Sequence, residues 1–356
     1  MVGYVITEFT DLTWECNGLL DFQRQPKAVA KCMAEFQSQD VLIAEWEQPC
    51  IWSGEPVRMH IYLSHYSSRD VRNAELHWHL HDEHDGNVIA ENNVGSIHVR
   101  RAHVERIVTT ELLMPDVTSP QWFRLDAQLR NADEVIASTH KRLLVIPREW
   151  RVWDDALPSS VYVHDPQGWF GDLLERLGVS GATIADKPTD AKFIITASLD
   201  EVMQCELKRG ASVLWIVERA RAVPSPLPEF TILDRRHKGR WGDWCSSFIW
   251  LASELRRELS APAILCAALR DIVPNCVIEF DETRALHREG CELKPHVRML
   301  AGIFVGWLHH QAGIAVEFGI GDGKLLVTTF PLASKWLRSP AATAMLRCMM
   351  KRLMHK

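Results

Sequence analysis

The sequence has 356 residues, of which 47% are hydrophobic and 24% charged, and its formal net charge is −6 at neutral pH. At about 100–200 residues for an ordinary domain, this length predicts two or three domains with real cores. The composition excludes a disordered or collagen-like chain. A mildly acidic chain has no electrostatic reason to bind a phosphate backbone, so we expect no nucleic-acid partner.

Nine cysteines are scattered along the chain without a Cys-x-x-Cys pair, which favours reduced thiols over a disulfide or zinc framework. The longest apolar stretch, 299–308, contains two glycines and falls short of the ~20 residues that cross a bilayer. No basic segment followed by an apolar block opens the chain, so no signal peptide is visible. We therefore expect a cytoplasmic protein without a membrane partner.

The first 39 residues predict one strand, one long loop and one helix. Residues 2–9 are β-branched or aromatic on both faces, as in a strand buried on both sides of a parallel sheet or barrel. Residues 10–25 contain Asp, Asn and Gly, which are typical of a loop. Pro26 opens a helix at its first turn. The apolar residues after it recur at helical spacing: Ala28, Val29, Cys32, Met33 and Phe36.

Between residues 40 and 147 hydrophobic and polar residues alternate, which is the pattern of half-buried strands. The alternation is clear over 58–63, 75–80 and 123–129, and Asp85-Gly86 supplies a turn. Short strands at regular spacing over about 100 residues predict an immunoglobulin-like β-sandwich.

A Trp-bearing linker over 148–158 leads to a last region, 159–356, in which strands alternate with short helices. The predicted strands are 160–163, 182–185, 192–197 and 213–217, the predicted helices 169–177 and 199–208. A hairpin over 315–318 and 324–330 and a closing helix over 341–354 follow. This order predicts a parallel sheet covered by helices, in a flavodoxin-like α/β domain.

Residues 3–11, Gly-Tyr-Val-Ile-Thr-Glu-Phe-Thr-Asp, precede Asn17-Gly18-Leu19-Leu20-Asp21 and then Arg24-Gln25-Pro26-Lys27. This stretch resembles the last strand, loop and helix of the catalytic barrel in glycoside hydrolase family 2, which includes β-galactosidases, β-glucuronidases and β-mannosidases. An immunoglobulin-like sandwich commonly follows the barrel in that family. The order strand, helix, sandwich and α/β domain supports the resemblance more than any single motif does.

Hydrolysis of a glycosidic bond needs two carboxylates, which lie ~5–5.5 Å apart in retaining enzymes. In the family they come from the fourth and seventh barrel strands. The Thr-Glu-Phe sequence around Glu8 resembles the strand that carries the nucleophile. That strand would be the seventh, however, and a seventh strand must be followed by a helix, an eighth strand and another helix. Only one predicted helix separates Glu8 from the alternating region. This count favours the eighth strand, so no catalytic residue is assigned and Glu8 is the only candidate.

The resemblance implies that Glu8, Asp11, Trp14 and Asn17 line the barrel mouth and contact the substrate. The alternative, that Glu8 merely caps the end of its strand, stays open. Glucuronidases carry an Asn-x-Lys pair in this loop that binds the sugar carboxylate, whereas residues 15–18 are Glu-Cys-Asn-Gly. A uronic acid is therefore not the expected substrate, and no cofactor is implied.

His77, His79, His81 and His84 form the most metal-like cluster in the sequence. On a strand the first three project from one face, and imidazole is a good zinc ligand. Such residues lie roughly 6.5–7 Å apart, however, and rarely close a tetrahedral site without help from a neighbour. The residues between them are apolar and take the core face. We therefore expect a solvent-facing polar row and no metal.

Two features of the last region suggest ligands only weakly. Gly319 to Lys324 faintly resembles a phosphate loop, but it opens a strand and a hairpin turn fits it better. An amidotransferase would need a nucleophile at a strand-to-helix elbow, whereas Glu218 follows the predicted strand and the strand ends carry residues 164–169 and 218–220. The domain resembles the catalytically silent amidotransferase-like modules beside several glycosidase barrels, which pack against the barrel or help to build oligomers.

Tryptophan is frequent, with fourteen against four tyrosines, and Trp241, Trp244 and Trp250 lie close together. Aromatic faces stack on sugars and also anchor interfaces. Packing in a core or an interface is the favoured interpretation. The cluster is also the first candidate for a surface that contacts a barrel or a partner subunit.

Together these observations predict a multidomain chain, α/β plus all-β: the end of a TIM barrel (1–39), a sandwich (40–147), a linker (148–158) and a flavodoxin-like domain (159–356). The predicted function is the C-terminal part of a family 2-type glycoside hydrolase, inactive alone. Carbohydrate is the expected partner, and a separate chain that supplies the rest of the barrel and a homo-oligomer stay open. So do a non-catalytic carbohydrate-binding or oligomerisation scaffold and a glycosidase that uses Glu8.

Overall fold

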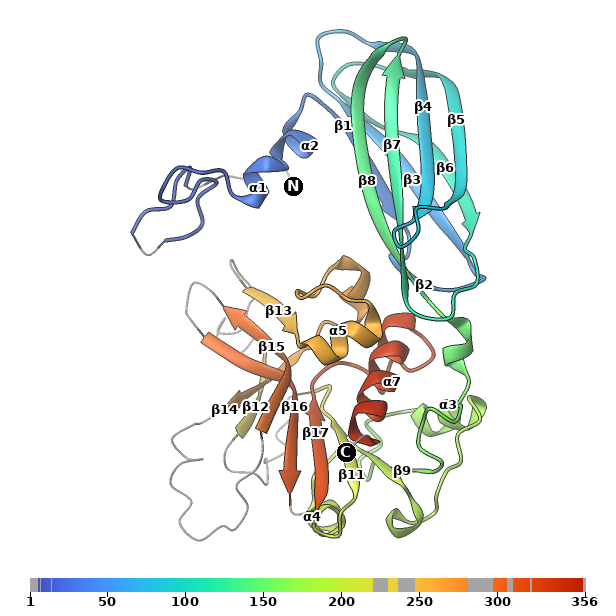
Figure 1. The fold of residues 1–356 in the computed structure, drawn as a ribbon, viewed down its shortest axis with the longest axis vertical. Coiled ribbons are helices and arrows are strands. Elements are labelled where there is room, and N and C mark those ends of the chain that lie inside the picture. Colours follow the sequence, from blue (N-terminus) through green and yellow to red (C-terminus); the bar gives the residue numbers. More distant parts are fainter. Residues whose placement is uncertain are drawn as a thin grey trace. The chain divides into compact units, whose positions relative to one another are not determined.

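The computed structural model describes residues 6, 8–13, 15–219, 230–235, 247–280, 297–305, 310–320 and 322–354. The chain divides into two compact units, which are treated separately below (Figure 1). The first unit contains residues 1–47, 56–113 and 123–142. The second contains residues 48–55, 114–122 and 143–356.

The first unit begins with a loop and two short helices, α1 (Ala28–Lys31) and α2 (Met33–Gln37), where the sequence predicted one helix. The break lies at Cys32, whose side chain caps neither helix. Val29 and Phe36 are half exposed, at 51% and 50%. Because helices this short depend on tertiary packing, an apolar stripe without cover does not hold a continuous helix.

The predicted barrel strand over 2–9 lies mostly outside the described residues. Where the description begins, Thr10 forms a single parallel bridge with Leu20 rather than a ladder. The described part of the chain contains no TIM barrel, so that part of the predicted fold class is not confirmed.

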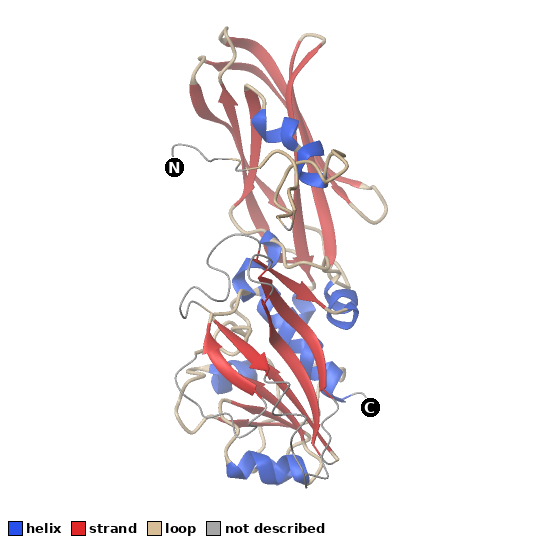
Figure 2. Cartoon of the chain, turned by 90° about the vertical axis from the view of Figure 1, so that its left-hand side faces the viewer, coloured by secondary structure: helices blue, strands red, loops and turns tan. Residues whose placement is uncertain are grey.

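Two antiparallel sheets make up the rest of the first unit (Figures 1 and 2). One has the order β1-β3-β6, and the other contains β8-β7-β4-β5. The strands are β1 (Asp40–Trp46), β3 (Pro56–His65), β4 (Val71–Asp82), β5 (Val88–Val99), β6 (His103–Leu113), β7 (Gln121–Asn131) and β8 (Glu134–Ile146).

Alternate residues of these strands are buried, as the period of a strand with one core face requires. The buried sets are Leu42, Ala44 and Trp46 in β1, Met59, Ile61 and Leu63 in β3, Leu76, Trp78 and Leu80 in β4, and Leu125, Ala127 and Leu129 in β7. The β-sandwich predicted from the alternation is thus confirmed in its coarse form. Its immunoglobulin-like assignment and the domain bounds stay predictions.

The second unit is built on a nine-stranded mixed sheet, together with β2 (Cys50–Trp52), which pairs in parallel with the end of β8. The strands of the sheet are β9 (Val161–His164), β10 (Phe193–Thr196), β11 (Ser212–Ile216), β12 (Phe230–Asp234), β13 (Ser247–Leu251), β14 (Cys276–Phe280), β15 (Val297–Val305), β16 (His310–Ile320) and β17 (Gly323–Thr328). The α-helices are α3 (Leu173–Val179), α4 (Glu201–Lys208), α5 (Ser253–Leu259) and α7 (Pro340–Met354). Short 3-10 helices are η1 (Arg148–Arg151), η2 (Pro188–Asp190) and η4 (Ala267–Ile272).

Strands β9, β10, β11 and β17 pair in parallel, close to where the sequence predicted strands. Their runs are apolar throughout because both faces are covered. On one face Ile195, Leu214 and Leu326 pack in the cluster that includes α3, α5 and α7. On the other face Ile194 and Val213 pack with α4. The predicted strand 182–185 is reduced to one parallel bridge between Ile184 and Val161.

The flavodoxin-like prediction is not confirmed for the whole region. Beyond β17 the sheet continues through the antiparallel strands β16, β14 and β12, and β13 and β15 pair antiparallel beside them. Strands β16 and β17 follow one another closely in the chain and pair as an antiparallel hairpin, whereas a parallel pair needs a longer crossover connection.

The closing helix α7 is buried along nearly its whole length. Its Arg347 is 1% exposed, and the guanidinium donates to Asp154 Oδ2 at 2.6 Å and to the Val152 carbonyl at 3.0 Å. A cation so deeply buried needs these partners. Among the described residues, no helix is both long and apolar enough to cross a membrane.

A buried hydrogen-bond network fixes the start of β1 against the end of β3. The ring of His65, 2% exposed, lies 2.6 Å from Asp40 Oδ1 and 2.6 Å from the Arg69 carbonyl, so both ring nitrogens face acceptors. Ser67 also donates to Asp40. Burial opposes the ionisation of Asp40, but the hydrogen bonds from Ser67 and His65 outweigh it and hold the pKa of Asp40 below its usual value.

We predict that Asp40→Asn lowers the free energy of unfolding at pH 7 by about 1–3 kcal/mol, because a buried donor loses its charged acceptor. The depressed pKa means that ionised Asp40 stabilises the fold above the unfolded-state pKa of ~3.9 and that this contribution is lost as pH falls. The variant is therefore expected to lose less stability than the natural chain between about pH 5 and pH 2. Urea unfolding across that range, with exposed Asp133→Asn as control, measures both effects, and equal acid slopes for the three proteins would refute the assignment.

Candidate functional site

A compact loop over residues 9–27 gathers most of the residues predicted to bind a ligand. Asp11 is buried, and its Oδ1 accepts from the Gly18 amide at 2.9 Å and from Lys27 Nζ at 2.5 Å. Lys27 also donates to the Cys16 carbonyl at 2.9 Å. A partly buried ion pair therefore connects the two ends of the loop.

Backbone hydrogen bonds bring three segments of the loop side by side. The Asp11 amide donates to the Leu20 carbonyl, and the Leu20 amide donates to the Phe9 carbonyl, both at 2.9 Å. The Lys27 amide donates to the Leu19 carbonyl at 3.0 Å. The segment is thus held by its own backbone as well as by the Asp11–Lys27 pair.

Gly18 allows this close approach. A Cβ at that position would lie 2.5 Å from the Asp11 amide nitrogen and 2.5 Å from the Thr10 carbonyl carbon. Both atoms belong to the backbone and cannot swing away as a side chain would. Only glycine fits here, which gives a structural reason for the Asn-Gly step of the motif.

Carboxyl groups gather at the start of the loop. Glu8 is half-buried, and its hydrogen bond with the Glu15 side chain, partial burial and repulsion from Glu15 and Asp11 raise its pKa, while Lys27 lowers it less. Its Oε2 is enclosed, and in the described part of the chain it has no hydrogen-bond partner. Two hydrogen-bonded carboxyl groups share one site most readily when one of them is protonated.

The structure places Glu8 near enough to Asp11 for their charges to interact and leaves Asn17 exposed nearby in the chain, while their contact with a substrate stays a prediction. Trp14 lies outside the described residues. Sequence reasoning did not name Glu15 or Lys27 as site residues. Lys27 was visible only as part of the Arg-x-Pro-Lys helix start, whereas nothing in the sequence marked Glu15.

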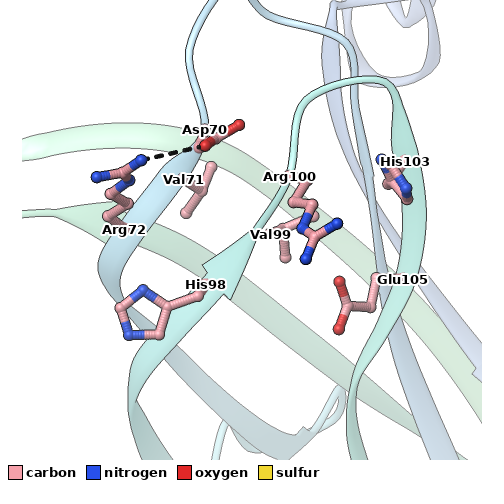
Figure 3. A pocket seen from close by; sticks show the side chains of 8 residues that line it. All are labelled: Asp70, Val71, Arg72, His98, Val99, Arg100, His103 and Glu105. Carbon is pink, nitrogen blue, oxygen red and sulfur yellow. Dashed lines mark hydrogen bonds and ion pairs between the residues drawn. The ribbon is translucent and has the colours of Figure 1, made fainter.

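A second polar surface lies on the sandwich, where β4 begins, β5 ends and β6 begins (Figure 3). It is an open hollow of about 690 Å³. The lining residues are mostly charged or imidazole side chains: Asp70, Val71, Arg72, His98, Val99, Arg100, His103 and Glu105. A hydrogen bond from the Arg101 amide, and then Arg72 at 3.3 Å, lower the pKa of Asp70. Sequence reasoning did not find this surface, because its residues come from three separate strands.

In the second unit, the carboxyl ends of the parallel strands carry an imidazole–carboxylate pair. His164 Nε2 lies 2.6 Å from Asp200 Oδ2, while Asp200 Oδ1 accepts from the Met203 amide and caps α4. Burial of Asp200 opposes its ionisation, but the hydrogen bond from His164 lowers its pKa overall. At the end of the same strand, Asp165 accepts from the amides of Trp169 and Phe170.

This edge is where open α/β sheets bind ligands. Here the cavity lined by residues 169–170 and 216–219 measures about 20 Å³, which is room for one water. Glu218 Oε1 accepts from the Ser334 amide at 2.9 Å. In the part of the chain that is described, the strand ends are therefore filled by their own polar contacts.

The remaining sequence features have structural explanations where they are described. Lys324 belongs to β17 and pairs with Gly319 across the β16–β17 hairpin, while Gly321 lies outside the described residues. Trp250 lies in β13 opposite Gly302, where a Cβ would lie 2.8 Å from the indole nitrogen. The other two tryptophans of that cluster, 241 and 244, lie outside the described residues.

Comparisons with known proteins add little. A model for a domain of unknown function (DUF8488) matches residues 55–153, and no curated protein matches the chain. Among solved structures, the sporulation control protein Spo0M from Bacillus subtilis is 15% identical, with a TM-score of 0.25. The matched region covers 32% of this chain and 51% of the Spo0M chain. The CARDB domain of the PF1109 protein from Pyrococcus furiosus, solved in complex with di-metal ions, is 7% identical, with a TM-score of 0.23. The matched region covers 30% of this chain and 91% of the CARDB chain.

A β-glucuronidase from Parabacteroides merdae is 14% identical and covers 49% of this chain and 24% of its own, with a TM-score of 0.22. The chain thus spans about half the length of Spo0M and about a quarter of the glucuronidase. With TM-scores this low, none of these likenesses assigns an activity to this chain.

We predict that Gly18→Ala opens the loop over residues 9–27 and costs about 1–3 kcal/mol of local stability, since the added methyl group overpacks against backbone. Amide hydrogen exchange of this loop should become faster, while exchange in β4 and β7 stays unchanged. Gly95→Ala is the matched control, because a Cβ there meets nothing within 4 Å. Equal exchange in both variants would contradict the packing described.

Proposed function

We propose that the chain is the C-terminal part of a family 2-type glycoside hydrolase architecture and that residues 8–27 form a sugar-contacting loop in it. The sandwich would be the immunoglobulin-like domain that follows the barrel, and the second unit an amidotransferase-like module. We further propose that the chain alone does not hydrolyse glycosides. The observation that carries this proposal is the Asp11–Gly18–Lys27 framework.

These three residues belong to the stretch that resembles the family, and each is used in closing the loop. A loop held by a partly buried ion pair keeps its exposed groups in fixed positions, and carboxylates and amides in fixed positions suit sugar hydroxyls. Glu8, Glu15 and Asn17 are among the polar groups that this loop offers. Lys27 is already engaged by Asp11 and the Cys16 carbonyl, which agrees with a neutral sugar rather than a uronic acid.

The proposed lack of hydrolysis is supported by the interaction of the carboxyl groups. The Glu15 side chain is the first cause of the raised pKa of Glu8, so these two carboxyl groups interact directly. The two carboxyl groups of a glycosidase instead have the glycosidic bond between them. Glu8 and Glu15 are therefore not proposed as that pair.

Strand order supports the proposal for the second unit. Starting from Ile184, the parallel neighbours are β9, β10, β11 and β17, so the order in the sheet is 2-1-3-4-5 along the chain. This is the order of flavodoxin-like sheets. The water-sized cavity at the strand ends agrees with a catalytically silent module.

A second candidate function, glycoside hydrolysis with Glu8 as a catalytic carboxylate, is favoured by one observation. Glu8 has a raised pKa, which is the property of a general acid in glycosidases. Glu8 would then work with a carboxylate that this loop does not supply.

Both candidates are tested by incubating the purified full chain with aryl β-galactoside, β-mannoside, β-glucoside and β-glucuronide. We expect no release of the aryl group above the rate of the Glu8→Gln variant. Hydrolysis that Glu8→Gln abolishes would replace the proposal with the second candidate.

Sugar binding is tested separately by saturation-transfer NMR with the corresponding free sugars. We expect weak binding of a neutral sugar that falls at least about tenfold in Lys27→Met, since a buried Asp11 without its cation cannot hold the loop. Lys31→Met, an exposed lysine of α1, is the matched control. If no sugar binds, or if both lysine variants bind as the natural chain does, the loop is not a sugar site.

A further inference from the structure

We propose that the outer face of β4 and β7 binds a divalent transition-metal ion through His79, His81 and Asp126. One donor atom from each residue lies within 4.8 Å of the other two. His79 Nε2 is 3.9 Å and His81 Nδ1 is 3.6 Å from the same oxygen, Asp126 Oδ2. The imidazole rings are stacked, with their centroids 5.4 Å apart.

The sheet produces this arrangement directly. Leu76, Trp78 and Leu80 are buried, so the histidines between and beyond them project from the other face. Strand β7 pairs antiparallel with β4 and brings Asp126 directly opposite His79. This carboxylate is the neighbouring ligand that a row of histidines on one strand lacks.

The donor atoms are close to the spacing that a metal requires. With metal–nitrogen and metal–oxygen bonds of about 2.0–2.2 Å, tetrahedral ligand atoms lie about 3.4 Å apart. The distances of 3.6 and 3.9 Å to Asp126 Oδ2 need a contraction of a few tenths of an ångström, and the two imidazole nitrogens, which lie within 4.8 Å of one another, must also move to the ligand spacing. Side-chain rotations on a sheet surface provide such movement without a change in the backbone.

Arg124 leaves the ligating oxygen free. Its Nε and Nη2 contact Asp126 Oδ1, at 3.0 and 2.9 Å, and not Oδ2. An arginine in this place orients the carboxylate, as groups behind metal ligands commonly do. Its positive charge also opposes a second cation, so we expect an affinity below that of a structural zinc site.

An enclosed ring nitrogen of His81 also supports the metal site. Its Nδ1 is enclosed by protein atoms, and in the described part of the chain it has no hydrogen-bond partner. A buried ring nitrogen without a partner is costly, and coordination would satisfy it.

His77 belongs to the same row but not to the site. Its Nδ1 lies 2.6 Å from Asn93 Oδ1, and its Nε2 lies 3.5 Å from Glu75 Oε2. Both ring nitrogens thus face oxygen atoms of other residues. His77 is therefore a matched control that shares the residue type, strand and face.

The ligand set defines the class of ion. Two imidazole nitrogens and one carboxylate oxygen suit Zn²⁺, Co²⁺ or Ni²⁺ and leave a fourth position for water. Ca²⁺ and Mg²⁺ prefer all-oxygen sites with more ligands, so we expect neither to compete.

The test uses the full chain, freed of metal by chelator. Cys16, Cys32 and Cys205, the exposed cysteines of the described residues, and Cys245 and Cys291, which lie outside them, are replaced by serine so that these thiols do not bind the probe. Calorimetry with Zn²⁺ should show one saturable site, and Co²⁺ should give the visible absorption of a low-coordinate complex. His79→Ala, His81→Ala and Asp126→Asn should each weaken Zn²⁺ binding at least about tenfold, whereas His77→Ala should leave it unchanged.

The melting temperature of each variant is measured without metal. A variant that melts at the temperature of the parent protein is still folded, so its loss of Zn²⁺ binding is not caused by unfolding of the sandwich. Three outcomes would each overturn the proposal: no saturable Zn²⁺ binding, the same loss in His77→Ala as in His79→Ala, or displacement of Zn²⁺ by equal concentrations of Mg²⁺. The outcome does not depend on whether the loop binds sugar, because Cys16→Ser, the substitution within that loop, is common to all the proteins compared.

Discussion

The alternation of side chains along a strand is the constraint on which the first unit depends. Once Leu76, Trp78 and Leu80 are committed to the core, every other residue of β4 must face outward. A slip of one residue would move a tryptophan and two leucines into solvent and histidines into the core, so the register is strongly specified. The same constraint that builds the sandwich therefore also places the imidazole groups together on its surface.

The N-terminal loop depends on a different kind of constraint. Asp11 is buried, and a buried carboxylate is tolerated only when it is paired and hydrogen-bonded. The Gly18 amide, from the middle of the loop, and Lys27, from its end, meet that requirement. The sequence separation of these residues makes the loop a single closed unit, although the helices that follow it are short and largely exposed.

Sequence reasoning succeeded where a local period decides the structure. It found the alternating strands of the sandwich, the parallel strands β9, β10 and β11, and the closing helix α7, because burial leaves a period of two, a continuous apolar run or a period of 3.6 in the residues themselves. It also found the β16–β17 hairpin, but it did not find the break at Cys32 or the antiparallel strands β12 to β15. Whether a helix is covered, and which strand a strand meets, are decided by tertiary contacts that no local window contains.

The functional residues follow the same division. Glu8 and Asp11 were singled out because a short motif marks them, and their role stays a prediction, whereas Glu15 comes near Glu8 only through the fold of the loop. The histidine row was visible in the sequence, but Asp126 lies far from it along the chain and meets His79 only through the pairing of β4 with β7. The sequence argument against a metal rested on a missing neighbour, and the register of β7 removes that premise. Geometry across strands therefore changes the chemical interpretation of residues that the sequence had already singled out.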